Sequence, residues 1–319
     1  MTLLGTLLAA GLALGQVEKE VKHPITGQYK GEIKDPVKKD VIMRVAMQAP
    51  SSLPEKKTLG LILLHHGFNG NENNYFPGTV ECAKRLGLTD QYVIIAGKSR
   101  GAGWAPADDE YVLRLVAWAK ETYPIDPRRV YLWGSSNGAA FVGRFGWHHQ
   151  DLFAAVVGYC GSYGSLGEPP ACYKARPGLP GPADLVRTEW YFVHGGDDSP
   201  ENSRRACDTL KQKGYRYVFR QLDGYGHTDI WDGQGHPDMT LVNACRDDYL
   251  LWLRALRHCT DRLGWWCRGR GRCFPSRRPD VVGGLGSHFS PAAHRARTWP
   301  RGGHLTGLRV RAGSSGAYG

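Results

Sequence analysis

Residues 130–142 read Val-Tyr-Leu-Trp-Gly-Ser-Ser-Asn-Gly-Ala-Ala-Phe-Val, and this stretch decides the fold class. Its first four residues are apolar and favour a buried strand, whereas the small residues after Gly138 are compatible with a helix. Gly134 and Gly138 lie two positions on either side of Ser136. A tight strand-to-helix turn strains the backbone of its central residue and needs neighbours with almost no side chain. The stretch therefore predicts a strand, a sharp turn and a helix, with the Ser136 hydroxyl exposed at the apex.

The expected position of this hydroxyl has a chemical meaning. It lies beyond the sheet edge at the positive end of a helix, where developing negative charge is stabilised. The pattern Gly-x-Ser-x-Gly alone also fits an ordinary surface turn, because the chain contains 42 Gly. The strand pattern before it and the helix pattern after it favour a nucleophilic serine.

Strand and helix patterns alternate along the chain on both sides of this turn. Continuous apolar runs at Leu59–His65 and Tyr92–Ala96 are typical of buried parallel strands, and Asp108–Tyr123 is amphipathic with acids in its first turn. Repeated strand–helix units predict one α/β domain over residues 16–257, with a mostly parallel sheet and helices on both faces. Further strands are expected at Val41–Met47, Arg129–Trp133, Phe153–Tyr159, Glu189–His194 and Tyr215–Leu222, and further helices after Ser136, after Ser199-Pro200 and over Asp238–Arg257.

A serine nucleophile needs a histidine to take its proton and a carboxylate to hold that histidine in the right tautomer. In an open α/β sheet these groups come from loops at the carboxyl ends of later strands. The loop after the strand that ends at His194 contains Asp197 and Asp198, and the next such loop contains Asp223 and His227. The order serine, acid, histidine is the order of one particular hydrolase fold.

His227 is the best candidate base, because a glycine-flanked turn after a strand can present its imidazole to a cleft. The spacing from His194 favours Asp198 over Asp197 as the acid, and the choice between the two stays open. Asp223 is less suitable, since it lies close to His227 on the same strand end. His194 itself is expected to be a structural residue of the turn.

Two backbone N–H groups are expected to bind the negative oxygen of a reaction intermediate. One belongs to Asn137, directly after the serine, and the other to Phe68, in the loop after the Leu59–His65 strand. The adjacent His65 and His66 favour a structural role over a metal site, because neighbours on a strand point to opposite faces. Since no Cys-x-x-Cys spacing occurs, the sequence predicts no zinc site.

These motifs resemble the α/β-hydrolase superfamily over residues 40–257, and within it the secreted esterases of the polyhydroxybutyrate-depolymerase and feruloyl-esterase type. The resemblance implies an α/β-hydrolase fold, a serine carboxylic-ester hydrolase, and neither a metal nor an organic cofactor. Ala139 departs from many relatives, which have a further glycine there. The motifs are Leu63-Leu64-His65-His66-Gly67-Phe68, Tyr123-Pro124-Ile125-Asp126-Pro127-Arg128-Arg129-Val130-Tyr131, Gly134-x-Ser136-x-Gly138, His194-Gly195-x-x-Asp198 and Gly224-x-Gly226-His227.

Three loops, 99–107, 162–188 and 228–237, are expected to form the cleft walls. Their aromatic residues suit a groove for short-chain, aryl (feruloyl-like) or polyester substrates, although aromatics in loops are equally common as packing. No large cap domain fits in an insertion of this length. The candidate substrate-contacting aromatics are Tyr75, Trp104 and Trp231.

Two other functions remain open. A serine peptidase of the prolyl-oligopeptidase type uses the same catalytic parts, although no propeller-sized region precedes the domain. A protein with a hydrolase fold that binds a partner or polymer without catalysis is the second alternative. Against it, every catalytic role has a chemically competent residue in the right order.

The net charge of +11 is concentrated in residues 258–319, which hold 11 Arg and 2 Asp. Since residues 1–257 carry only +2 and contain no basic patch interleaved with aromatics, a nucleic-acid partner is not expected. The tail is rich in Gly, Arg and Pro without an apolar period, which predicts disorder. It is either a basic extension or an end foreign to the domain, and carries no catalysis.

Residues 1–15 contain an apolar run too short to span a bilayer, followed by polar residues from Gln16 onward. Small residues near Gly15 suit a signal peptidase, although a positive n-region is missing. The segment predicts a signal peptide, a secreted or periplasmic protein and no stable membrane insertion. The eight cysteines fit an exported protein. Candidate disulfides are Cys160–Cys172 and Cys207–Cys245, although connectivity cannot be deduced from sequence. The oligomeric state is not indicated.

Overall fold

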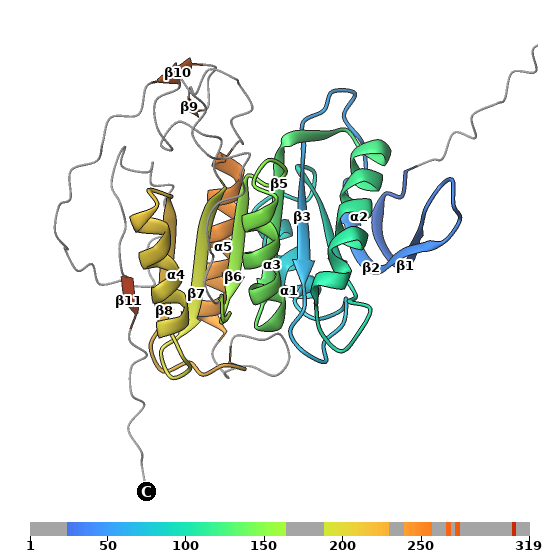
Figure 1. The fold of residues 1–319 in the computed structure, drawn as a ribbon. Helices are drawn as coiled ribbons and strands as arrows, with labels where there is room; N and C mark the ends of the chain where they lie inside the picture. Colours follow the sequence, from blue (N-terminus) through green and yellow to red (C-terminus); the bar gives the residue numbers. More distant parts are fainter. Residues whose placement is uncertain are drawn as a thin grey trace, which may run out of the picture.

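The computed structural model describes residues 24–163, 188–229 and 239–256, together with the backbone of three short strands nearer the C-terminus. Its centre is a single twisted sheet flanked by helices (Figure 1). The strands are β1 (Gly27–Lys34), β2 (Val41–Ala49), β3 (Leu59–His65), β4 (Tyr92–Gly97), β5 (Ile125–Ser135), β6 (Ala155–Tyr159), β7 (Glu189–Gly195), β8 (Tyr217–Leu222), β9 (Trp266–Arg268), β10 (Arg272–Phe274) and β11 (Leu308–Val310). The helices are α1 (Phe76–Arg85), α2 (Asp109–Thr122), α3 (Asn137–His148), α4 (Glu201–Gln212) and α5 (Thr240–Ala255), with a 3₁₀ turn at Pro106–Asp108.

The nine-stranded sheet has the order β1-β2-β4-β3-β5-β6-β7-β8-β11. The β2 strand is antiparallel to both of its neighbours, and every pairing from β4 onward is parallel. The predicted mostly parallel sheet is therefore confirmed. Since the carboxyl ends of parallel strands meet at one edge, the loops after β3, β5, β6, β7 and β8 lie near one another.

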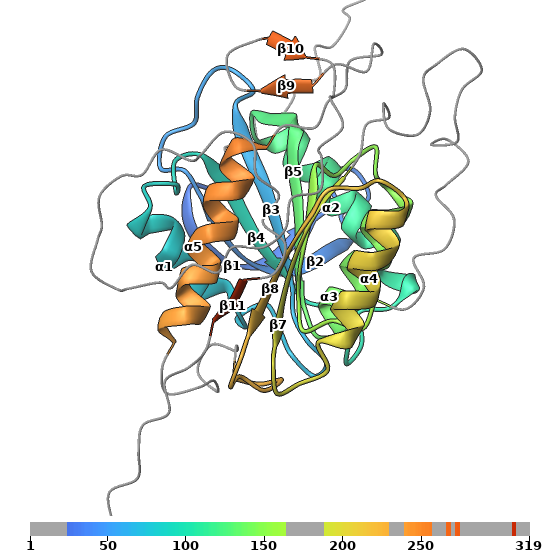
Figure 2. The same ribbon diagram turned by 90° about the vertical axis from the view of Figure 1, so that its left-hand side faces the viewer.

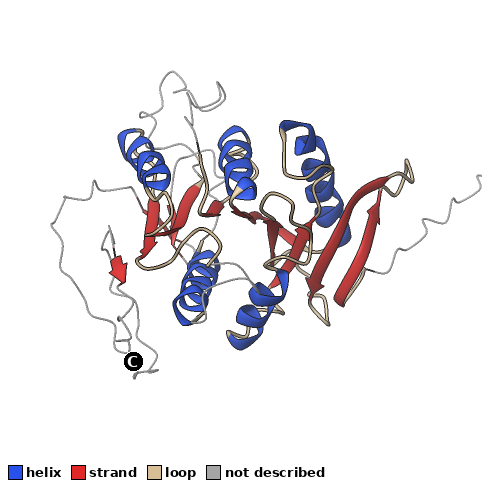
Figure 3. Ribbon diagram, turned by 90° about the horizontal axis from the view of Figure 1, so that it is seen from below, coloured by secondary structure: helices blue, strands red, loops and turns tan. Residues whose placement is uncertain are grey.

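Helices cover both faces of this sheet, as Figures 2 and 3 show. The α2, α3 and α4 helices pack on one face and the α1 and α5 helices on the other, each with its own apolar cluster. Successive β3 residues alternate between the two clusters, with Leu61 and Leu63 in one and Ile62 and Leu64 in the other. This alternation explains why β3 reads as a continuous apolar run, since both of its faces are buried.

Within residues 16–257, the β1 strand and the α1 helix were not predicted. The β1 strand lies at the edge of the sheet and is mostly exposed, so it lacks an apolar signature. The α1 helix contains Pro77, which normally indicates a break, but the first helical turn tolerates proline because its N–H groups have no acceptor within the helix.

The β5 strand begins at Ile125, earlier than the expected Arg129, and therefore includes Pro127. Its pairing with β3 shifts register between Leu59–Ile125 and Leu61–Val130. Such an irregularity accommodates Pro127, which cannot donate a ladder hydrogen bond.

The predicted Cys207–Cys245 disulfide is wrong. Cys207 lies on α4 and Cys245 on α5, so the sheet separates the two thiols. Cys160 is likewise a free, buried thiol, and its suggested partner Cys172 lies outside the described residues. Sequence spacing could not reveal which face of the sheet each cysteine occupies.

Several predictions fall outside the described residues. They concern the signal peptide, most of the loop 162–188, Trp231, and the 258–319 tail apart from the backbone of β9, β10 and β11. Among the described helices, none has the length and apolar character needed to cross a membrane.

Candidate active site

Ser136 occupies the sharp turn between β5 and α3 that the sequence predicts. Its backbone is left-handed at φ 54°, a conformation that a residue with a side chain seldom adopts. A Cβ atom on Gly134 would collide with the Gly138 carbonyl, and one on Gly138 would collide with the His65 carbonyl. Both glycines are therefore required by the close approach of three backbone segments.

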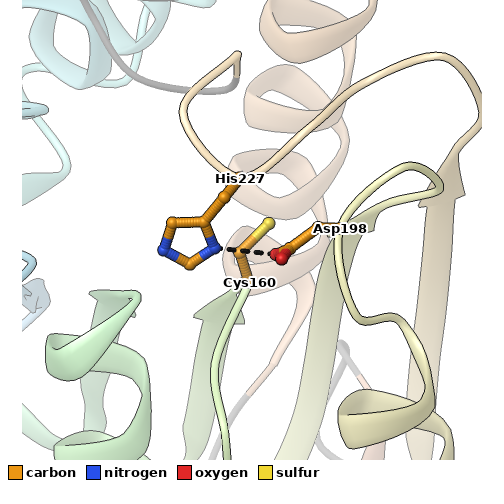
Figure 4. A group of neighbouring side chains, drawn as sticks. All are labelled: Cys160, Asp198 and His227. Carbon is orange, nitrogen blue, oxygen red and sulfur yellow. Dashed lines mark hydrogen bonds and ion pairs between the residues drawn. The ribbon is translucent and has the colours of Figure 1, made fainter.

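The structure brings Ser136, His227 and Asp198 into one hydrogen-bonded chain. Ser136 Oγ lies 2.9 Å from His227 Nε2, and His227 Nδ1 lies 2.7 Å from Asp198 Oδ2. Figure 4 shows the second of these contacts, between the loops that follow β7 and β8. Asp197, the alternative acid, is exposed, and Asp223 accepts a hydrogen bond from Gln221. The geometry thus favours Asp198.

The charge of Asp198 is stabilised by its neighbours. Partial burial opposes ionisation, but the hydrogen bond from His227 and the electrostatic attraction of the nearby His227 and His194 rings outweigh it and hold the pKa of Asp198 below its usual value. A carboxylate that stays ionised can orient an imidazole and stabilise its protonated form.

A second imidazole contacts the same carboxylate oxygen. His194 Nε2 lies 3.0 Å from Asp198 Oδ2, and His194 Nδ1 lies 2.8 Å from Ser203 Oγ on α4. The His194 side chain is buried, and desolvation lowers its pKa although the nearby Asp198 carboxylate opposes this shift. The sequence analysis assigns His194 only a structural role in the turn, and nothing in the sequence indicates that His194 contacts Asp198.

The residues predicted to supply oxyanion donors lie on segments next to Ser136. A Cβ on Gly67 would lie 3.3 Å from Ser136 Cβ, so the loop carrying Phe68 lies against Ser136. Asn137 is the first residue of α3, and its N–H is among the first four helical donors, which have no acceptor within the helix. The Asn137 side chain also fixes the neighbouring loop, because its Oδ1 accepts a hydrogen bond from the backbone N–H of Trp104 at 2.6 Å.

Two of the predicted substrate-contacting aromatics are instead packing residues. Trp104 is 5% exposed, and its ring lies 4.5 Å from the His65 ring. Tyr75 is 3% exposed and packs against Trp133. Phe68, by contrast, is 62% exposed, on the loop that lies against Ser136. The burial of Trp104 and Tyr75 therefore argues against their predicted contact with substrate.

His65 and His66 both lie beneath the site and both rings contact Trp104. His65 Nδ1 is bonded to the Trp133 carbonyl at 3.0 Å, and His66 Nε2 accepts the Ser99 N–H at 3.1 Å. They share a neighbour despite the expected opposite faces, because β3 ends at His65 and the chain turns. Burial lowers the pKa of each to about 4.

These two pKa values predict a loss of stability in mild acid. Between the usual histidine pKa of about 6.5 and the folded value, the unfolded chain binds protons that the folded protein excludes. The free energy of unfolding is therefore expected to fall as the pH drops through this range, by up to about 1.4 kcal/mol per pH unit for each histidine. Guanidinium unfolding curves recorded at several pH values measure this change in the free energy of unfolding. A free energy of unfolding that stays constant over this pH range would contradict the prediction.

Comparisons with known proteins identify the fold. No protein-family model matches the chain, and no curated protein matches it in sequence. Solved structures do match with probability 1.00. A fluorophosphonate-binding serine hydrolase of Staphylococcus aureus, FphF, superposes with a TM-score of 0.53 at 14% identity, covering 71% of this chain and 98% of that one. An S-formylglutathione hydrolase of the same organism has a TM-score of 0.53 at 13% identity over 73% and 98%.

A third solved structure, described as a ferulic acid esterase, has a TM-score of 0.52 at 16% identity and covers 71% of this chain and 96% of its own. The chain therefore has the α/β-hydrolase fold. At these identities the likeness establishes the fold, and the chemistry of the site has to be argued from its residues.

Proposed function

We propose that the protein is a serine carboxylic-ester hydrolase that acts through an acyl-enzyme formed on Ser136. The observation that carries the proposal is the chain of hydrogen bonds from Ser136 Oγ through His227 to Asp198. A strained turn presents the hydroxyl at a helix N-terminus, and two backbone N–H groups flank it. These are the parts that acyl transfer from an ester requires.

The proposed reaction has two halves. His227 Nε2 takes the Ser136 proton as Oγ attacks the ester carbonyl, and the N–H groups of Phe68 and Asn137 stabilise the resulting oxyanion. Protonated His227 then gives its proton to the leaving alcohol. In the second half a water molecule, deprotonated by His227, releases the acid and regenerates the serine. Asp198 keeps the imidazole in the accepting tautomer throughout.

The substrate range that we propose is short-chain, aryl or polyester. Support comes from the exposed Phe68 ring beside the nucleophile, which offers an apolar contact for an aryl or alkyl acyl group. Rates on acetyl, butyryl and feruloyl esters and on a polyester film, measured side by side, rank these classes. Export to the periplasm or the medium is part of the same proposal and is tested by fractionating cells that express the full chain.

A fluorophosphonate probe tests the reaction class without knowledge of the substrate. Covalent labelling at Ser136, located by peptide mass mapping, is the expected result. If the folded protein is not labelled, the esterase proposal fails and a non-catalytic binding protein becomes the better explanation. Turnover of a proline-containing peptide amide faster than of any ester would favour the peptidase alternative.

His194 provides a matched pair of variants that tests how Asp198 is held. His194→Gln keeps an N–H at the position of Nε2, whereas His194→Asn keeps only the group near Ser203. We expect His194→Asn to lower kcat by about 10–100-fold with little change in KM, because a small misplacement of the acid propagates to the base.

The pH profile separates this role from simple structural damage. Without the His194 imidazole 3.0 Å from Asp198 Oδ2, the carboxylate attracts the protonated His227 ring more strongly, so the acid limb of kcat/KM should move to higher pH in His194→Asn. His194→Gln should retain most of the activity and the parent profile. Equal losses in the two variants, with an unmoved profile, would contradict a positioning role.

A further inference from the structure

Cys160 is a third potential ligand group beside the Asp198–His227 pair. It follows β6 directly, and its Sγ, an Asp198 oxygen and a His227 ring nitrogen all lie within 4.8 Å of one another. Figure 4 shows the Cys160 side chain between the ring of His227 and the carboxylate of Asp198. No step of the proposed reaction uses this thiol.

The backbone holds the thiol in this place. Cys160 is left-handed at φ 48°, and its N–H donates to the Val193 carbonyl at 2.8 Å. The Gly195 N–H points at Sγ from 3.5 Å, on the neighbouring strand. Two adjacent strands of the sheet therefore fix the sulfur. Burial raises the pKa of the Cys160 thiol, which the Gly195 N–H only partly opposes, so the thiol keeps its proton until a metal ion displaces it.

Sulfur, imidazole nitrogen and carboxylate oxygen are the three ligand types that Zn²⁺ binds in proteins. Bond lengths of about 2.0–2.3 Å in a tetrahedron place the ligand atoms about 3.3–3.7 Å apart. The 2.7 Å distance between His227 Nδ1 and Asp198 Oδ2 must therefore lengthen slightly, and all three ligand atoms already lie within 4.8 Å of one another. Access is available from the outside, because the His227 side chain is 40% exposed.

We propose that Cys160, Asp198 and His227 form a Zn²⁺ site whose occupation inhibits the enzyme. The inhibitory part rests on the proposed function, whereas the binding part does not. With three protein ligands, the fourth position of the tetrahedron is left for a water molecule.

The inhibition follows from the tautomer of His227. In the active arrangement Nδ1 carries the proton, which it donates to Asp198, and Nε2 accepts from Ser136. Zn²⁺ on Nδ1 requires that this proton leave and that Nε2 take one up. The Cys160 S–H proton is also released as the Zn–S bond forms, so binding frees one proton in total. The Nε2–H ring can no longer accept the serine proton.

This mechanism predicts the kinetic pattern. The ion lies on the Asp198 side of the imidazole, away from the serine, so substrate and Zn²⁺ need not exclude each other. Zn²⁺ should lower kcat with little change in KM, and a chelator should restore the rate.

Binding is tested first in Ser136→Ala, which keeps all three ligands and lacks the nucleophile. Titration with Co²⁺ should produce a near-ultraviolet thiolate-to-cobalt absorption that Zn²⁺ abolishes by displacement. Adding Cys160→Ser or Cys160→Ala should remove that absorption and weaken Zn²⁺ binding by about 100-fold or more, since losing a direct ligand costs more than losing a supporting residue. Both Cys160 variants are made so that the test still stands if one of them fails to fold. Cys82→Ser, which removes a buried thiol on α1, is the matched control.

Inhibition is tested second, with each variant compared with its own metal-free rate. Loss of Zn²⁺ inhibition in the Cys160 variants but not in Cys82→Ser supports the proposal. Equal inhibition of all variants, or cobalt binding that survives both Cys160 replacements, overturns it. If Co²⁺ binds through Cys160 but no ester is hydrolysed by the parent protein, the esterase proposal fails and the metal site stands.

Discussion

Ser136→Ala should lower kcat for a short p-nitrophenyl ester by about 10⁵–10⁶-fold, with circular dichroism and thermal unfolding unchanged. The reason is that the acyl-enzyme cannot form without Oγ, whereas the Phe68 and Asn137 N–H groups remain in place. Those donors can still stabilise direct attack by water, so a residual rate above the uncatalysed one is expected. Steady-state kinetics at saturating ester, together with the loss of fluorophosphonate labelling, measure the effect.

The neighbouring serine in the same motif is a matched control for this result. Ser135 is fully buried and ends β5. Since its hydroxyl makes no hydrogen bond in the described part of the chain, Ser135→Ala should leave kcat close to that of the parent. Turnover retained in Ser136→Ala, or lost equally in both variants, would eliminate the proposed mechanism.

Much of this site was predictable because its signals are local. The Gly134-x-Ser136-x-Gly138 pattern lies between a strand pattern and a helix pattern, and each of these depends on residues within one short window. The loop positions of Asp198 and His227 were predictable for a related reason. In a parallel sheet, strand ends collect at one edge, so a titratable residue directly after a strand belongs to the site region.

What could not be predicted depends on packing between distant segments. The sequence does not say whether a loop aromatic turns outward or inward, so Trp104 and Tyr75 were assigned to the cleft although neighbouring rings bury them. Cys160, Asp198 and His227 follow three different strands, and only the folded sheet determines how close these three strand ends bring them. The pairing of Cys207 with Cys245 failed for the same reason, since helix patterns do not identify the face that a helix covers.

The choice between Asp198 and Asp197 gives the second large prediction. Asp198→Asn should lower kcat at neutral pH by about 10⁴-fold with little change in KM. The asparagine keeps the size of the side chain, but its amide can donate to His227 Nδ1. That hydrogen bond favours the tautomer with the proton on Nε2, which cannot accept the serine proton. Because burial and hydrogen bonds around this carboxylate are otherwise preserved, the loss reports the charge and the tautomer rather than the fold.

Asp197→Asn is the matched control, because it makes the same chemical change one residue away on an exposed side chain. It should leave kcat close to the parent value. The reverse pattern, with the large loss in Asp197→Asn, would show that the loop after β7 rearranges in solution and that the acid was assigned to the wrong residue. Equal, small effects would show that His227 is oriented without a carboxylate. In that case the contact between His194 and Asp198 would be structural, and the tautomer argument for zinc inhibition would lose its basis as well.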